Sequence, residues 1–161
     1  MRLSPRGVLV AFEGIDGAGK TTQVGLLEAW ANARGIDLVR TKEPTNGQWG
    51  QKLRASAQTG RLPPDEELAM FLKDRREHVE TLLEPRLAAG ALVLVDRYYF
   101  STAAYQGARG YDPASILKQN EEFAPIPDLL VILDVSPGTG GGEALAAIRA
   151  FDRDVCVDRK S

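Results

Sequence analysis

The stretch FEGIDGAGKTTQ, residues 12–23, carries the strongest signal in the chain. Residues 14–21 fit the pattern G-x-x-x-x-G-K-[ST], with an apolar run before the first glycine and a helical pattern after the lysine. Glycines allow positive φ angles and a close approach of the main chain to an anion, so successive backbone N–H groups form a nest for phosphate oxygens. The start of the following helix adds the positive end of its dipole. The pattern therefore predicts a site for a nucleoside triphosphate.

Each position of this loop has an expected role. Lys20 should reach the β- and γ-phosphates, and the Thr21 hydroxyl should ligate Mg²⁺, the one cofactor that we predict. The alternative is a glycine turn with a solvated lysine, but the eight-residue pattern and both flanks favour the phosphate site. The predicted ATP-binding residues are Gly14, Asp16, Gly17, Ala18, Gly19, Lys20, Thr21 and Thr22.

Apolar runs and helical patterns alternate along the chain. Continuous runs rich in Val, Leu and Ile are typical of parallel strands covered on both faces. They occupy 7–14, 91–97 and 128–135, with a weaker run at 36–41. Helical patterns fall at 20–34, 48–58, 64–88, 100–109 and 113–123. This order predicts an α/β fold with a doubly wound parallel sheet, and the length of 161 residues predicts a single domain, 1–161.

Acidic residues follow the predicted strands: Glu13, Glu43, Asp96 and Asp134. Ligands of open α/β sheets bind at the carboxyl ends of the strands, so these acids predict a shared site there. For any one of them alone, capping of the next helix is the better interpretation.

The bulk properties exclude several classes of protein. A net charge of −2 argues against non-specific binding to nucleic acid or anionic membranes. Cys156 is the sole cysteine, so neither an internal disulfide nor a multi-cysteine zinc site forms. His78, the sole histidine, is expected at the surface of a charged helix. No apolar run is long enough for a membrane span, and we expect a cytoplasmic protein.

The helical pattern at 64–88 places an arginine on an apolar face. Arg75 comes four residues after Phe71, so both lie on one side of the helix. A buried arginine needs acceptors, and a ring one turn away offers a stacking surface, so the pair suits a nucleobase. The alternative is an arginine whose stem lies along the apolar face while its head pairs with Asp74 or Glu80. Spacing alone does not separate the two.

The segment VDRYYFSTAAYQGARG, residues 95–110, suggests a second part of the site. Asp96 ends a strand and is placed to order Mg²⁺ through water. Arg97 has the planar fork that binds a phosphate in two places. Hydroxyl and amide side chains then recur at helical spacing and suit one wall of a pocket: Ser101, Thr102, Tyr105 and Gln106. An ordinary amphipathic helix is the alternative.

These segments, together with TKEPT, FLKDRREHV and PDLLVILDV, resemble the thymidylate kinase family, of the P-loop nucleoside-monophosphate kinase type, over residues 7–135. The resemblance implies transfer of the γ-phosphate of ATP to dTMP, giving dTDP, by a homodimer. The residues that it places in catalysis are Lys20, Asp16, Arg97 and Arg153. Those that it places at dTMP are Glu43, Arg54, Phe71, Arg75, Arg97, Ser101, Thr102, Tyr105 and Gln106. Thr21 and Asp96 would hold the metal.

The resemblance weakens after Asp134. The family continues into an arginine-rich lid, further helices and another strand, and we expect these to be incomplete here. Arg149 and Arg153, near FDRDVCVDRKS (151–161), are the candidate lid arginines, with an ordinary surface position as the alternative. Three other functions stay open: a kinase for another monophosphate or a deoxynucleoside, a nucleotide-binding module with little turnover, and an ATPase switch.

Overall fold

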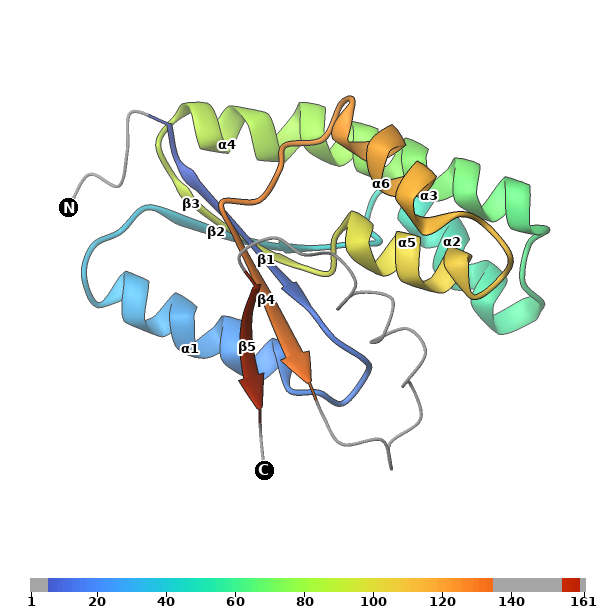
Figure 1. Ribbon diagram of the computed structural model, residues 1–161. Helices are drawn as coiled ribbons and strands as arrows, with labels where there is room; N and C mark the ends of the chain where they lie inside the picture. The colour runs from blue at the N-terminus through green and yellow to red at the C-terminus, as the bar shows by residue number, and fades with distance from the viewer. Residues whose placement is uncertain (1–5, 135–154, 160–161) are drawn as a thin grey trace.

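The computed structural model describes residues 6–134 and 155–159, which form one parallel sheet between two layers of helices (Figure 1). The strands are β1 (Val8–Glu13), β2 (Leu38–Lys42), β3 (Leu92–Asp96), β4 (Leu129–Asp134) and β5 (Val155–Arg159). Their spatial order is β2-β3-β1-β4-β5, and every neighbouring pair is parallel. The predicted doubly wound fold is therefore confirmed.

Alternation along the central strand explains the two cores. Leu9 and Ala11 of β1 belong to a cluster on one face of the sheet, whereas Val10 and Phe12 belong to a cluster on the other. Both clusters are buried, which is why β1 is apolar at every position from Val8 to Phe12 instead of at alternate ones. In this sheet it is central, pairing with β3 on one side and β4 on the other.

The helices divide between the two faces. In the described part of the chain, helix α1 (Lys20–Asn32) alone covers one face, and its residues Val24 and Ala31 pack into the core there (Figure 1). The opposite layer holds the other helices that the structure describes: α2 (Gln48–Thr59), α3 (Pro64–His78), the π-helical segment η1 (Val79–Leu83), α4 (Glu84–Ala88), α5 (Tyr99–Gly107) and α6 (Pro113–Glu121). None of these helices combines the length and hydrophobicity that a span of the bilayer needs.

Two features of the fold depart from the sequence predictions. The helix predicted at 64–88 is continuous but widens to a π-helix at Val79–Leu83, just before Pro85. A proline inside a helix lacks the N–H for the preceding turn and its ring crowds the carbonyl there, and a wider turn relieves both. The second feature is a fifth strand: within the segment 151–161, where we expect the family's lid to be incomplete, Val155–Arg159 pairs with β4.

Candidate active site

The phosphate loop connects the end of β1 to the start of α1. Gly14, Gly17 and Gly19 have φ angles of 142°, 80° and 94°, values that residues other than glycine rarely adopt. At Gly14 there is also no room, since a Cβ would lie 2.7 Å from the carbonyl oxygen of Leu133. The glycines at these positions therefore set the path of the loop, as the sequence predicted.

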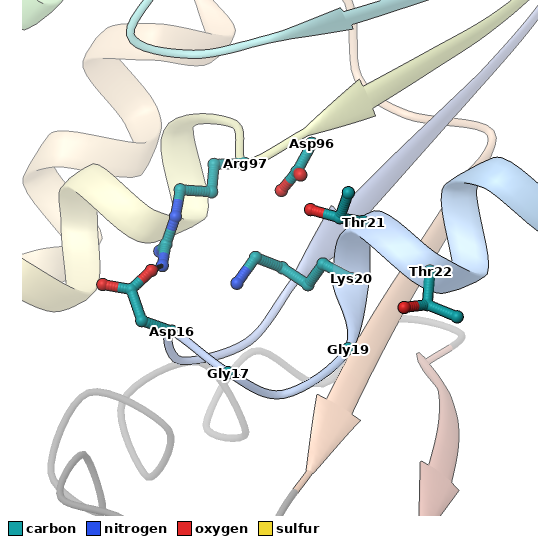
Figure 2. A pocket seen from close by; sticks show the side chains of 8 residues that line it. All are labelled: Asp16, Gly17, Gly19, Lys20, Thr21, Thr22, Asp96 and Arg97. Carbon is teal, nitrogen blue, oxygen red and sulfur yellow. Dashed lines mark hydrogen bonds and ion pairs between the residues drawn. The ribbon is translucent and has the colours of Figure 1, made fainter.

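A cavity of about 380 Å³ lies over this loop (Figure 2). Its lining comes from the loop, the first turn of α1 and the end of β3: Asp16, Gly17, Gly19, Lys20, Thr21, Thr22, Asp96 and Arg97. Of the eight predicted ATP-binding residues, Gly14 and Ala18 do not line the cavity. Ala18 is instead buried with Ile15 and Leu133. The other six are brought together as predicted.

The side chain of Lys20 points into the loop. Its ammonium donates hydrogen bonds of 2.8 Å to the carbonyl oxygens of Gly14 and Ile15. Burial lowers the pKa of Lys20, an effect that Arg97 adds to and nearby carboxylates oppose. The ammonium therefore rests on main-chain acceptors at the floor of the cavity, and a phosphate would offer it stronger, charged acceptors.

Thr21 and Asp96 provide oxygen donors suited to Mg²⁺. The Thr21 hydroxyl and the Asp96 carboxylate face each other across the space between α1 and β3 (Figure 2). Both residues also line a second cavity of about 390 Å³, formed with residues at the end of β2: Arg40, Thr41, Lys42, Thr45 and Asn46. In the part of the chain that the structure describes, no group of three or more His, Cys, Asp or Glu side chains could hold a metal. Mg²⁺ typically takes one or two protein oxygens and completes its shell with phosphates and water, so this donor pair fits it.

Arg97 enters the same cavity from the turn after β3. Its Nη2 donates a 2.6 Å hydrogen bond to Oδ1 of Asp16, and its guanidinium lies 5.7 Å from the centre of the Tyr105 ring. The hydrogen bond and the positive charge of Arg97 hold the pKa of Asp16 below its usual value. The predicted phosphate-binding arginine is thus beside the phosphate loop, with a loop carboxylate as its partner.

Arg75 is buried in a polar network between α3, α5 and α6. It donates to Glu43 Oε2 at 2.7 Å, to Asn120 Oδ1 at 2.6 Å and to Thr102 Oγ1 at 3.0 Å. The predicted alternative, pairing with Asp74 or Glu80 at the surface, is wrong, because only 1% of Arg75 is exposed and its carboxylate partner is Glu43.

The expectation that His78 lies at the surface is also wrong. His78 is 5% exposed, and its ring nitrogens lie 2.8 Å from Glu43 Oε1 and 2.8 Å from Thr41 Oγ1. Burial alone would raise the pKa of Glu43, but the charge of Arg75 and the hydrogen bond from His78 outweigh it and lower the pKa. Glu43 is therefore a buried anion between a guanidinium and an imidazole.

The predicted wall on α5 is mostly occupied by internal hydrogen bonds. The Ser101 hydroxyl donates to Glu13, and Nε2 of Gln106 donates to Glu67 at 2.7 Å. Oε1 of Gln106 is buried and accepts no hydrogen bond within the described part of the chain. Tyr105 is 38% exposed beside Arg97. Oε1 of Gln106 and the ring of Tyr105 are thus the parts of this wall that remain for a ligand.

The remaining predicted residues are placed as follows. Arg54 lies on α2 and donates to the carbonyl oxygen of Pro44 at 2.9 Å. Phe71 is half-buried on α3, one turn before Arg75. The candidate lid arginines, Arg149 and Arg153, fall outside the described residues.

The acids at the strand ends have separate roles. Glu13 accepts the main-chain N–H groups of Tyr98 and Ser101 at the start of α5. This is the capping alternative, although the capped helix does not directly follow the strand that carries Glu13. Glu43 holds Arg75 and His78. Among these acids, Asp96 lines both of the cavities described above.

Sequence reasoning missed several buried polar residues. Asn120 is fully buried and holds Arg75, and nothing in its helical pattern predicts this. Glu67 is 4% exposed and accepts from Gln106, Arg61 and Arg109. The burial of His78 could have been predicted, since positions 71, 75 and 78 share one face of a helix and that face is apolar.

Comparison with known proteins identifies the family. A family model described as thymidylate kinase matches residues 12–141. The chain belongs to the thymidylate kinase family.

Individual members of the thymidylate kinase family agree with this assignment. The thymidylate kinase of Akkermansia muciniphila is 57% identical over 130 residues, and that of Xanthomonas oryzae pv. oryzae is 53% identical over 150. These matches cover 81% and 93% of this chain, but only 63% and 64% of the relatives, so the chain spans less than two thirds of their length. A crystal structure of thymidylate kinase from Ehrlichia chaffeensis superposes with a TM-score of 0.83 at 31% identity, covering 96% of this chain and 93% of that one.

Proposed function

We propose that this chain transfers the γ-phosphate of ATP to dTMP and releases dTDP. One observation carries the proposal: Lys20 and Thr21 of the phosphate loop and Arg97 of the D-R-Y turn line a single cavity. The loop suits the phosphates of the donor, and a guanidinium beside it suits the phosphate of the acceptor. Membership of the thymidylate kinase family supports dTMP as that acceptor.

Phosphoryl transfer depends mainly on alignment and on neutralising charge. Backbone N–H groups of the loop would cradle the donor phosphates, and Lys20 would exchange its two carbonyl partners for phosphate oxygens. Arg97 would exchange Asp16 for the phosphate of dTMP. Thr21 and Asp96 would hold Mg²⁺, which neutralises charge on the donor phosphates when bound. An arginine from the lid, for which Arg153 is our candidate, would add to this charge.

The acceptor nucleoside would lie between α2, α3 and α5. Phe71 would stack on the base, and Arg75 would contact its edge. Arg75 has five N–H groups, and its contacts with Glu43, Asn120 and Thr102 leave at least one of them for a base. Arg54, Ser101, Thr102, Tyr105 and Gln106 would line the sugar, the phosphate and the base. A thymine methyl group adds only about 1–3 kcal/mol, so we expect modest discrimination against uracil from that contact.

We also propose that the protein acts in the cytoplasm as a homodimer, by analogy with the family. Light scattering on the purified chain tests the second point, and fractionation of the source cells tests the first.

The proposal is tested by incubating the chain with ATP, Mg²⁺ and dTMP, dUMP, dCMP or UMP, and measuring each diphosphate formed. Dominant dTDP supports the proposal. A different dominant product would make the chain a kinase of another monophosphate. Nucleotide binding without any diphosphate would make it a binding module, and ATP hydrolysis without an acceptor would make it an ATPase. The Lys20→Ala variant is the negative control for contaminating kinases.

A further inference from the structure

We infer that Glu13 is a positioning residue for the acceptor phosphate, because it ties the turn that presents Arg97 to the start of the phosphate loop. Glu13 is the last residue of β1, and Gly14, the first residue of the loop, follows it directly. The expected effect on dTMP rests on the proposed function, whereas the role of Glu13 in holding the turn does not depend on it.

The first argument is the set of hydrogen bonds at the start of α5. Helix α5 begins at Tyr99, and the Tyr98 side chain does not cap it. Oε1 of Glu13 instead accepts the main-chain N–H groups of Tyr98 at 2.8 Å and of Ser101 at 3.2 Å. Amides in the first turn of a helix have no partner within the helix, and here a strand far away in sequence supplies the acceptor. The capping carboxylate is completely buried.

The second argument is the backbone of Arg97. Among the described residues, Arg97 is the one non-glycine residue with a positive φ, at 65°. A conformation of this kind persists only where its surroundings hold it. The N–H of Arg97 donates to the carbonyl oxygen of Phe12 at 2.9 Å, and the next N–H, of Tyr98, donates to Glu13. Two consecutive residues of β1 therefore hold two consecutive amides of the turn.

The third argument concerns the side chain of Arg97. Its Nη1 donates to the Ser101 hydroxyl at 3.3 Å, and that hydroxyl donates to Oε2 of Glu13. Glu13 thus fixes the guanidinium through Ser101 as well as the backbone through Tyr98. The charged groups that act on its carboxyl include Arg97 and Lys20, which are the proposed contacts of the acceptor and donor phosphates. Its hydrogen bonds, however, go to the turn that carries Arg97, so loss of Glu13 should disturb the acceptor side more than the donor side.

The test compares Glu13→Ala, which removes both acceptor oxygens, with Glu13→Gln, which keeps one for the two N–H groups. Asp128→Ala is the matched control, because Asp128 also accepts an N–H of β1, that of Leu9 at 2.8 Å, at the opposite end of the strand. For each protein we would measure amide hydrogen exchange at residues 98 and 101, the calorimetric Kd for dTMP, and the KM values for dTMP and ATP.

We expect Glu13→Ala to speed exchange, most of all at Tyr98, and to weaken dTMP binding by about tenfold or more. The buried N–H of Tyr98 loses its acceptor, and that of Ser101 keeps only the carbonyl oxygen of Tyr98, at 3.1 Å. The KM for ATP should stay within about twofold, Glu13→Gln should restore most of the dTMP affinity, and Asp128→Ala should change none of these. If Glu13→Ala does not fold, Glu13→Asp, whose shorter side chain reaches the turn poorly, should show the same selective loss.

Two results would overturn the inference. The first is unchanged exchange at residues 98 and 101, and the second is an equal loss of affinity for ATP and dTMP. An inactive wild-type chain would instead contradict the proposed function, and exchange and calorimetry would still decide the role of Glu13, with absent dTMP binding counting against it.

Discussion

The carboxylate of Asp16 lies 2.6 Å from the guanidinium of Arg97 and so joins the phosphate loop to the turn after β3. The Asp16 side chain is 98% exposed, whereas that of Arg97 is 18% exposed. The arginine is therefore held in place by its surroundings, and the aspartate reaches it from solvent. Asp16 thus contacts the guanidinium at the position that we assign to the acceptor phosphate.

This contact predicts opposite effects on binding and on turnover for Asp16→Ala. Without the competing carboxylate, dTMP should bind up to about fivefold more tightly in the absence of ATP, since exposed ion pairs contribute little. The rate of dTDP formation should fall, because the resemblance places Asp16 among the catalytic residues. Calorimetry and steady-state kinetics measure the two effects. Weaker dTMP binding would show that Asp16 contacts the acceptor and does not compete with it.

Arg97→Ala should weaken dTMP binding by about ten- to a hundredfold, the contribution expected of charge-assisted hydrogen bonds to a phosphate. Binding of ATP should change little. Titration calorimetry with each nucleotide measures both. Arg34→Ala, at an exposed arginine just after α1, is the control. Wild-type affinity for dTMP in Arg97→Ala would remove this residue from the acceptor site.

Lys20→Ala should slow dTDP formation by at least about a hundredfold, because a positive charge at the transferring group is lost. The Kd for dTMP should stay unchanged, which separates this effect from that of Arg97. Quenched-flow measurement at saturating dTMP gives the rate. Lys52→Ala, on α2, is the control and should retain the wild-type rate. A rate near that of wild type in Lys20→Ala would argue against donor binding at this loop.

Glu13 should make the stability of the fold depend on pH. Burial raises its pKa from 4.5 to about 7, although hydrogen bonds from Ser101 and Tyr98 and the charge of Arg97 lower it. Between these values the folded chain holds a proton that the unfolded chain has lost, so the free energy of unfolding falls as the pH rises from 4.5 to about 7. At about 1.4 kcal/mol per pK unit the decline is on the order of 3 kcal/mol.

Urea unfolding of the wild-type chain and Glu13→Gln at pH 5 to 8 measures this contribution. The glutamine has no proton to exchange in this range, so the difference in stability between the two proteins should change with pH in the direction just given. Parallel curves for the two proteins would contradict the raised pKa.

Glu43→Ala should be among the most destabilising substitutions. It leaves Arg75, which is 1% exposed, without its carboxylate, and breaking a buried pair costs about 3–5 kcal/mol. Chemical denaturation gives the value. Glu28→Ala breaks the half-exposed pair with Arg40 and should cost no more than about 1 kcal/mol. Equal losses in the two variants would mean that the buried network contributes no more than a surface pair.

Local patterns predicted the frame of the molecule but not its buried polar contacts. The phosphate loop and β1, β3 and β4 follow from continuous apolar runs and glycine spacing, which are properties of neighbouring residues. The network of Arg75, Glu43 and His78 joins α3 to the end of β2, and its acceptors depend on how distant elements pack. The sequence could show that Arg75 needed an acceptor, but it could not show which one.

Strand β5 was missed for a related reason. VCVDR is short and includes charged residues, so its pattern resembles a loop, whereas its pairing with β4 comes from the sheet edge that β4 offers. Sheet formation depends on the available partner strand as much as on the strand itself.

The pairing of β1 also bears on how the chain acquires its structure. Val8 pairs with Leu92 and Val10 with Leu129. The central strand is therefore synthesised first, but it can pair only after its neighbours, which lie far along the chain, have been synthesised. Contacts between residues so far apart in sequence require the closure of long loops and slow the search for the native state. On the ribosome, an apolar strand with both edges open would persist until β3 and then β4 emerge, and during that interval it is exposed to aggregation and to capture by chaperones.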